Sequence, residues 1–218
     1  MIKAVIFDFD GLILDTETAW YDSYKEVLKK QFEFDLPLEE FVKCVGSNDT
    51  WLFEYLEKEI AEHLDADNIR SSAGILHTEF VKEAKAREGV VEYLADAREA
   101  GLTIALATSS TREWVTTHLT NLNLISYFDH LITKDDVDRV KPAPDLFLKT
   151  IEVLGIEPHE AVVFEDSLNG LIAALEAKIP TVVIPNPVTE SLPFENYHLK
   201  LSSMADMSLQ DIIESLNK

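Results

Sequence analysis

The sequence contains a single cysteine, Cys44, among its 218 residues. One cysteine excludes a disulfide within the chain and a metal site built from several thiolates, and this scarcity is typical of a reducing compartment. No apolar run approaches the roughly 18 residues that a membrane-spanning helix needs. The first residues lack the basic, apolar and small-residue regions of a secretory leader. These absences together predict a soluble cytoplasmic protein.

Basic residues are also scarce, because 19 lysines and arginines stand against 40 acidic residues and give a formal charge of −21. Such a charge repels nucleic acids and anionic membranes, so we expect neither as a partner. A small anionic substrate would need local positive charge from a metal, a lysine or helix N-termini. The hydrophobic residues, 46% of the chain, are enough for a real core. We expect a monomer with one domain, or one domain with a smaller insert.

Five short apolar runs have the pattern of buried parallel strands. Helical patterns follow them, and two of these end at a glycine, as helices commonly do. Strands that alternate with helices predict an α/β fold, with a three-layer Rossmann-like core in which helices cover both faces of a parallel sheet. The predicted strands are Ala4–Phe9, Leu102–Ala107, His130–Thr133, Ala161–Phe164 and Thr181–Ile184, and the predicted helices are Val90–Ala100, Arg112–Leu122, Pro144–Leu154 and Asn169–Ala177.

One region breaks this alternation and shows only helical patterns. We therefore predict a helical cap (lid) domain at residues 17–87, inserted into a core domain made of residues 1–16 and 88–218. Both junctions would lie near the end of the first strand, which is a natural geometry for a hinged lid over a site. The four predicted helices of the cap are Tyr21–Lys30, Leu38–Val45, Trp51–His63 and Ile69–Ala86.

Polar residues that could act in catalysis or bind a ligand follow the predicted strands. Ligands bind beyond the carboxyl ends of the strands in an open parallel sheet, so we expect these residues to meet at one edge. Clustered carboxylates repel one another, and their hard oxygen atoms suit Mg²⁺ better than zinc. The residues are Asp8 and Asp10 after the first strand, Thr108, Ser109 and Ser110 after the second, Lys141 beside Pro142, and Glu165 and Asp166 after the strand that begins at Ala161.

Each of these patterns, taken alone, has a plainer structural explanation. Asp10-Gly11 is a common turn pair, and Asp15 could simply cap the helix that follows it. The Thr108–Ser110 segment could cap the helix near Arg112, and Lys141 could be an ordinary surface lysine. The six histidines show no spacing typical of metal ligands, so we interpret them as structural or surface residues.

Taken together, the same segments resemble the four motifs of the haloacid dehalogenase-like superfamily. Asp8-Phe9-Asp10-Gly11-Leu12-Ile13-Leu14-Asp15-Thr16 is similar to the first motif, and Thr108-Ser109-Ser110 to the second. Lys141-Pro142 is similar to the third, and Phe164-Glu165-Asp166-Ser167 to the fourth. The motifs occur in the family's order and the layout covers the whole chain. Within the superfamily, the chain is most similar to the small sugar-phosphate phosphatases and β-phosphoglucomutase.

This resemblance implies a covalent mechanism and assigns its residues. Asp8 would be the nucleophile that forms an aspartyl-phosphate, and Asp10 would be the general acid and then the base. Thr108 and Ser109 would hold the transferring phosphoryl oxygens, and Lys141 would pair with Asp8 and with those oxygens.

The resemblance also implies a magnesium site. Asp8, the backbone carbonyl of Asp10 and the Asp166 carboxylate would bind the ion, with Glu165 bound to it directly or through water. Phosphoryl transfer depends mainly on alignment and charge neutralisation, which such a site would supply.

Three functions are compatible with these residues, and the sequence favours a magnesium-dependent phosphatase acting on a small sugar-phosphate-like phosphomonoester. The first alternative is a phosphosugar mutase of the β-phosphoglucomutase type. That enzyme has a histidine where this chain has Trp20, and an arginine that grips the distal phosphate where this chain reads Val45-Gly46-Ser47-Asn48-Asp49. The second alternative is a non-catalytic phospho-aspartate signalling module. Such receivers are about half as long, lack the helical insert and carry the aspartate on a later strand.

The substrate itself is not evident from the sequence. We expect the cap to select it, through residues near the start of the insert and in its first loop. The residues predicted to contact substrate are Trp20, Gly46, Asn48 and Trp51.

Overall fold

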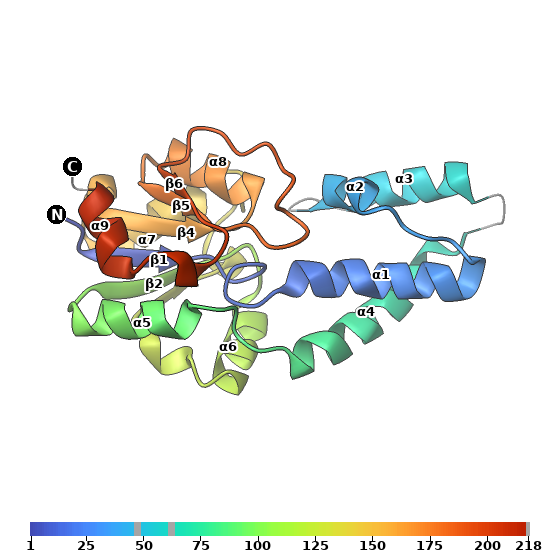
Figure 1. The fold of residues 1–218 in the computed structure, drawn as a ribbon, viewed down its shortest axis with the longest axis horizontal. Coiled ribbons are helices and arrows are strands. Elements are labelled where there is room, and N and C mark those ends of the chain that lie inside the picture. The colour runs from blue at the N-terminus through green and yellow to red at the C-terminus, as the bar shows by residue number, and fades with distance from the viewer. Residues whose placement is uncertain (46–48, 61–63, 217–218) are drawn as a thin grey trace.

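The computed structural model describes residues 1–45, 49–60 and 64–216, and it has the predicted α/β fold (Figure 1). Within these residues, six strands form one parallel sheet in the order β3-β2-β1-β4-β5-β6. All five predicted strands are present, each within two residues of its expected bounds, and β6 was not predicted. The strands are β1 (Ala4–Phe7), β2 (Thr103–Ala107), β3 (His130–Ile132), β4 (Ala161–Glu165), β5 (Thr181–Val183) and β6 (Leu199–Lys200).

Helices cover both faces of the sheet, because successive side chains of a strand point to opposite sides. Ala4 and Ile6 of β1 pack in one apolar layer with α7 (Asp145–Leu154) and α8 (Leu168–Glu176). The other apolar layer contains Val5 and Phe7 of β1 and three helices. These are α5 (Val90–Glu99), α6 (Arg112–Asn121) and α9 (Leu209–Leu216), of which α9 was not predicted.

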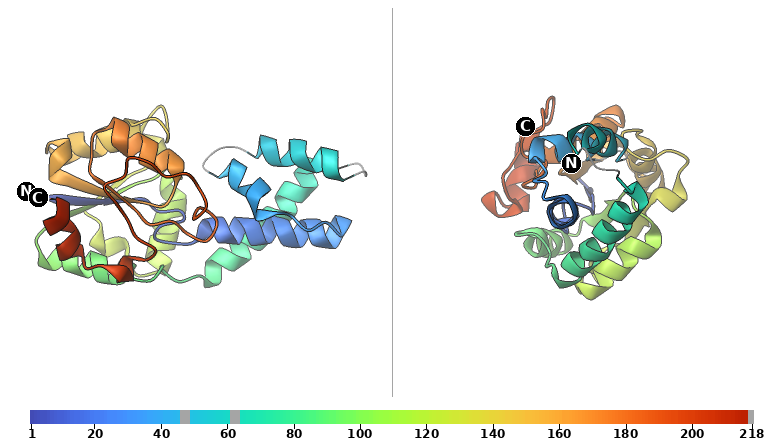
Figure 2. Two further views of the ribbon diagram at one scale, coloured as in Figure 1. Left: turned by 45° about the horizontal axis from the view of Figure 1, so that its top comes forward. Right: turned by 90° about the vertical axis from the view of Figure 1, so that its right-hand side faces the viewer.

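The helices between β1 and α5 extend away from the sheet, at the opposite end of the molecule from both termini (Figures 1 and 2). They share an apolar cluster in which Leu28, Leu52, Leu56 and Ile69 are fully buried, and Val188 of the segment after β5 also belongs to this cluster. The helices are α1 (Thr16–Phe32), α2 (Leu38–Phe41), a short 3₁₀ helix (Val42–Cys44), α3 (Thr50–Glu59) and α4 (Ala66–Glu83). We keep the name cap for residues 17–87, and the domain division at its two ends remains a prediction.

All four predicted cap helices differ from the sequence pattern in their bounds, and α4 lies three residues earlier than expected at each end. The α1 helix begins at Thr16 rather than Tyr21, because the Asp15 carboxylate accepts a hydrogen bond from the Thr18 amide at 3.1 Å and caps the helix. The predicted helix over residues 38–45 is divided into α2 and the 3₁₀ helix. The predicted helix over residues 51–63 ends in the structure at Glu59, and residues 61–63 lie outside the described residues.

The chain enters and leaves the cap at the same place. Leu14 and Ala86 form an antiparallel bridge, and the Arg87 amide donates to the Ile13 carbonyl at 2.9 Å. The Arg87 guanidinium also donates to the carbonyls of Gly11 and Pro185, the latter at 2.7 Å. The return from the cap is thereby fastened to the loop that follows β1.

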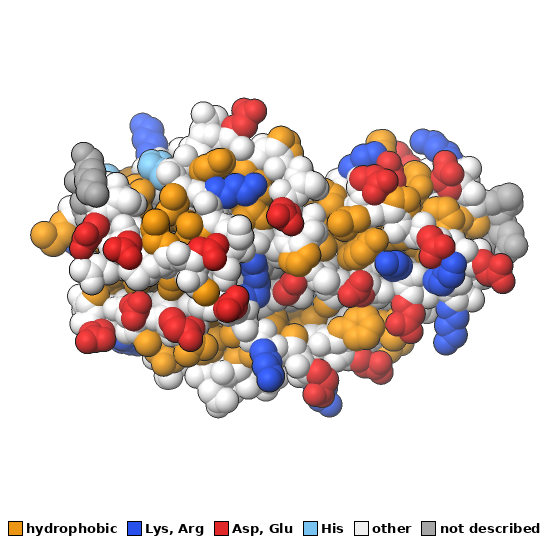
Figure 3. Space-filling model, viewed as in Figure 1, with side chains coloured by type: hydrophobic (Ala, Val, Ile, Leu, Met, Phe, Trp, Pro, Cys, Tyr) orange, Lys and Arg blue, Asp and Glu red, His pale blue; other side chains and the backbone are white. Residues whose placement is uncertain are grey.

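No helix in the described part of the chain is both long and apolar enough to span a membrane. On the face drawn in Figure 3, acidic side chains are spread over both the sheet region and the cap.

Candidate active site

The loop after β1 carries the first two aspartates and turns sharply behind them. Asp8 directly follows the last residue of the strand, and the backbone turns at Gly11 with a φ of 78°. A methyl group at Gly11 would overlap the Asp166 carboxylate and the Asn186 amide. Glycine therefore permits both the turn and the close approach of the loops after β4 and β5.

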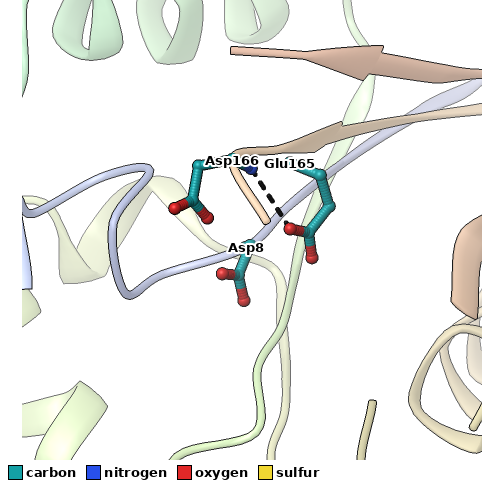
Figure 4. Close-up of side chains that lie close together, drawn as sticks. All are labelled: Asp8, Glu165 and Asp166. Carbon is teal, nitrogen blue, oxygen red and sulfur yellow. Dashed lines mark hydrogen bonds between the residues drawn. The ribbon is translucent and has the colours of Figure 1, made fainter. Parts of the chain in front are cut away.

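Three carboxylates converge at this edge of the sheet. Asp8, Glu165 and Asp166 each offer an oxygen, and these oxygens all lie within 4.8 Å of one another (Figure 4). The three residues are 6%, 0% and 1% exposed. Asp8 comes from the end of β1, and the other two come from the end of β4, so two neighbouring strands build the cluster as predicted.

Lys141 is the buried cation beside these carboxylates. Its Nζ donates to Asp8 Oδ1 at 2.6 Å, to Glu165 Oε1 at 2.6 Å and to the Ala107 carbonyl at 2.8 Å. Burial lowers the pKa of Lys141, but the two carboxylates raise it by more, so the ammonium stays charged. One ammonium leaves the three carboxylates with surplus negative charge.

The surplus charge and an unused oxygen fit a divalent cation. Asn186 donates to Asp166 Oδ2 at 2.7 Å, whereas the buried Oδ1 of Asp166 has no hydrogen-bond partner. Burial raises the pKa of both Asp8 and Asp166 above their ordinary values, and nearby Glu165 raises both further. Buried carboxylate oxygens of this kind are the donors that Mg²⁺ prefers, and a cation there would offset both the repulsion and the desolvation.

The Asp10 carboxylate is held apart from this cluster by two donors. Ser110 Oγ donates to its Oδ2 at 2.6 Å, and Trp114 Nε1 donates to its Oδ1 at 3.0 Å. Ser110 lies two residues before α6, and Trp114 lies in the first turn of that helix. The N-terminus of α6 is capped by the side chain of Thr111, which accepts a hydrogen bond from the Trp114 amide at 3.2 Å. The alternative that the Thr108–Ser110 segment caps this helix was therefore wrong by one position.

A cavity of about 760 Å³ opens beside these groups. Thr108 lies buried in its wall and accepts a hydrogen bond from the Ser110 amide at 3.1 Å, while Ser109 is exposed. The predicted core residues that line the cavity are Asp8, Asp10, Thr108, Ser109, Lys141 and Asp166, and the cap contributes Glu17 and Val45.

The cap residues predicted to contact substrate lie elsewhere or outside the described residues. Trp20 stacks on His77, with ring centroids 3.9 Å apart, and Trp51 is 44% exposed and donates to Glu40 at 3.2 Å. Neither tryptophan is among the described residues that line the cavity. Gly46 and Asn48 fall outside the described residues. The role of these four positions remains a prediction.

Glu17 is the cap carboxylate at the cavity, and it is not among the residues predicted from the sequence. The pKa of Glu17 is raised to about 7, mainly by burial and also by the neighbouring negative charges of Asp10 and Asp15. Its position one residue after the start of α1 places it at the junction of the cap and the core.

Three other residues that hold the site were also missed. They are Arg87, Asn186 and Trp114, each of which donates to a group of the loops after β1 and β4. Asn186 follows β5 at the same edge of the sheet. The rule that ligands bind beyond the carboxyl ends of parallel strands, which selected Asp166, could therefore have selected Asn186 as well. The other two carry no comparable signal in the sequence.

Comparison with known proteins gives consistent results. A family model described as "Haloacid dehalogenase-like hydrolase" matches residues 5–184. The "Putative phosphatase YhcW" of Bacillus subtilis (strain 168) is 43% identical over 218 residues, which cover 100% of this chain and 99% of that protein. The "Phosphorylated carbohydrates phosphatase" of Thermotoga maritima is 31% identical over 184 residues, covering 83% of this chain and 84% of that protein.

A solved structure supports the same fold. The crystal structure of a HAD family hydrolase from Deinococcus radiodurans R1 superposes with a TM-score of 0.84 at 24% identity, and the match covers 99% of this chain and 96% of that one.

Proposed function

The chain belongs to the haloacid dehalogenase-like hydrolase family, and we propose that it is a magnesium-dependent phosphatase that hydrolyses a small, sugar-phosphate-like phosphomonoester. One observation carries the proposal. Asp8 is buried against Lys141 and shares a carboxylate cluster with Asp166, while Asp10 lines the same cavity. That combination supplies a nucleophile, an acid and a place for a cation in one cavity.

In the proposed first step, a carboxylate oxygen of Asp8 attacks the phosphorus atom and the bond from phosphorus to the ester oxygen breaks. Lys141 holds Asp8 Oδ1 at 2.6 Å, which leaves the other oxygen to attack. Asp10 gives its proton to the departing ester oxygen. Thr108 and Ser109 hold the phosphoryl oxygens from the end of β2.

In the proposed second step, the oxygen of a water molecule attacks the phosphorus atom of the aspartyl-phosphate while Asp10 takes a proton from that water. The bond from phosphorus to the Asp8 oxygen breaks, Asp8 returns as a carboxylate, and inorganic phosphate leaves. Asp8, Asp166, the Asp10 backbone carbonyl and Glu165 would hold Mg²⁺, Glu165 directly or through water. When bound, the ion would neutralise charge on the carboxylates and on the phosphoryl group. The cap would exclude other water from the reaction.

The arginines of the cap favour a phosphatase over a mutase. A mutase must grip a second phosphate, and the two arginines within residues 17–87 are Arg70 and Arg87. Arg70 forms a two-point ion pair with Asp49, at 2.8 and 3.2 Å. Arg87 donates to backbone carbonyls of the core. Both guanidinium groups are therefore already engaged.

The curated relatives support the substrate class. Two carry the word phosphatase in their names, and the name of the Thermotoga maritima protein specifies phosphorylated carbohydrates. A signalling module has no comparable support, because the family that matches is one of hydrolases and the nucleophile follows the first strand.

Phosphate release tests the proposal directly. Purified protein would be incubated with Mg²⁺ and a panel of sugar phosphates, phosphoglycolate, nucleotides and a chromogenic ester. We expect release from at least one small ester, its loss in a chelator, and a fall of at least about 10⁴-fold in Asp8→Asn because the nucleophile is removed.

A matched control is Asp96→Asn, which removes one negative charge from the exposed face of α5 and should release phosphate as the unchanged protein does. Activity that survives Asp8→Asn would contradict the covalent mechanism. Efficient interconversion of β-glucose 1-phosphate and glucose 6-phosphate would favour the mutase instead.

A further inference from the structure

Trp114 touches both the proposed acid and the cap. Its indole Nε1 donates to Asp10 Oδ1 at 3.0 Å from the first turn of α6. An indole N–H can only donate, so it needs an acceptor wherever it is buried. The Asp10 carboxylate is that acceptor, and the Ser110 hydroxyl holds its second oxygen at 2.6 Å. Both Asp10 oxygens therefore have fixed partners in the core.

Trp114 also contacts the cap. The His77 ring of α4 stacks against the Trp114 ring, with centroids 5.7 Å apart and planes 19° apart. His77 also stacks on Trp20 of α1, at 3.9 Å and 12°. His77 is only 3% exposed, so these rings form a closed stack that crosses from the cap to the core.

We infer that Trp114 is a positioning residue, which holds the Asp10 carboxyl group in place for proton transfer and makes that position depend on the cap. The inference rests on the proposed phosphatase function, in which Asp10 gives its proton to the departing oxygen. An aspartate carboxyl group rotates about two side-chain torsions, and proton transfer requires a hydrogen-bond distance to the substrate. Two fixed donors, one of them on a rigid ring packed against the cap, restrict that rotation.

Trp114→Phe tests this assignment, because phenylalanine retains a ring for the stack but lacks the N–H group. The comparison uses two esters. An alkyl phosphate has a poor leaving group that needs the acid, whereas the leaving group of p-nitrophenyl phosphate departs as a stable anion without it. We expect kcat/KM, which reports the transfer to Asp8 and not the later hydrolysis common to both esters, to fall by about 10-fold for the alkyl phosphate. This is part of the roughly 10²–10⁴-fold that a general acid supplies, and kcat/KM for p-nitrophenyl phosphate should fall by less than about 2-fold.

Two further variants separate positioning from a general structural effect. Ser110→Ala removes the other donor and should change the ratio of the two rates in the same direction. Tyr93→Phe is the control, since it removes a hydrogen bond to the Met207 carbonyl, 2.8 Å long, in the core layer formed by α5 and α9. It should leave the ratio unchanged. An unchanged ratio of the two kcat/KM values in Trp114→Phe, whether both values fall equally or neither falls, would overturn the inference.

A second measurement does not depend on activity. The chain has three tryptophans, so protein labelled with ¹⁵N-tryptophan should show three indole N–H signals. The signal missing from Trp114→Phe identifies Trp114, and Asp10→Ala should shift that signal because its acceptor is gone. If no ester is hydrolysed at all, the proposed function fails, and this shift alone supports or overturns the contact between Trp114 and Asp10.

Discussion

The sheet edge and the cap use charged residues in opposite ways. At the sheet edge Lys141, Asp8 and Glu165 form a buried ion-pair network with distances of 2.6 Å. In the cap, Lys29–Asp35 and Arg70–Asp49 are also paired at 2.8 Å, but their side chains are exposed or half-buried. Breaking a buried pair costs about 3–5 kcal/mol, whereas an exposed pair contributes roughly 0–1 kcal/mol.

This difference shows where each region can tolerate change. The groups proposed for chemistry cannot move without leaving a buried charge unpaired. The cap is stabilised mainly by its apolar cluster, and its surface charges can vary at little cost. The cap can therefore change its exposed surface while the sheet edge keeps its geometry.

The largest effect that would sharpen this contrast is expected from Gly170→Ala in α8. The added methyl group would overlap the Glu165 carboxyl group, which Lys141 and the Ser167 hydroxyl hold at 2.6 and 3.1 Å. We expect a loss of about 1–3 kcal/mol in the free energy of unfolding from overpacking. Displacement of the cluster should lower phosphate release by up to about 10²-fold. Denaturant unfolding and the release assay measure the two effects, and unchanged values in both would contradict the tight packing described here.

The next effect concerns stability rather than phosphate release, and is expected in the pH dependence of His77→Gln. Burial lowers the pKa of His77 to about 4, and the neighbouring His118 lowers it too, although a hydrogen bond with the Thr16 backbone opposes both. The unfolded chain takes up this proton near its ordinary pKa of about 6.5, so the neutral ring favours the folded state above that pH. The stabilisation should be lost as the pH falls from about 6.5 to 4, by about 3 kcal/mol in total.

Denaturant unfolding at pH 7 and pH 4 measures this loss. The unchanged protein should lose more stability between the two pH values than His77→Gln does. His159→Gln, which changes an exposed histidine, is the matched control and should behave as the unchanged protein. An identical pH dependence in His77→Gln would mean that the stack between the cap and the core does not exclude water.

The smallest effect is expected from Gly74→Ala in α4, the counterpart of the Gly170 change. A methyl group at Gly74 would meet no atom within 4 Å. Alanine is more favourable than glycine inside a helix by about 1 kcal/mol, so the thermal midpoint should rise while phosphate release stays the same. A fall in stability would show that the cap is packed as tightly at this position as the sheet edge.

The sequence was most informative where a buried strand ends in polar residues. An apolar strand has few alternatives, and the aspartates that follow β1 and β4 had to meet because parallel strands end at one edge. The fold class, five strands and the cluster of Asp8, Glu165 and Asp166 could be predicted for this reason. The two residues of β6 are too few for a period to be recognised.

The remaining parts of the site depend on contacts between distant segments. Trp114 is separated from Asp10 by 104 positions, and Arg87 from Gly11 by 76. Nothing local marks a tryptophan in the first turn of α6, or an arginine just after α4, as the donor for a particular partner. Helical periodicity likewise predicts the cap helices but not which cap residues reach the cavity, and Glu17 and Val45 were missed for that reason.

The bridge between Leu14 and Ala86 has a consequence for how such a protein can diversify. The two ends of this insertion are held together by the bridge, so its length can vary. The entropy cost of closing a loop increases only slowly as the loop becomes longer. The intervening helices can be shortened, extended or exchanged for another module while β1 and its neighbours keep their register. In evolution or in engineering, the segment between Leu14 and Ala86 can therefore be replaced while the residues that follow β1 and β4 stay in place.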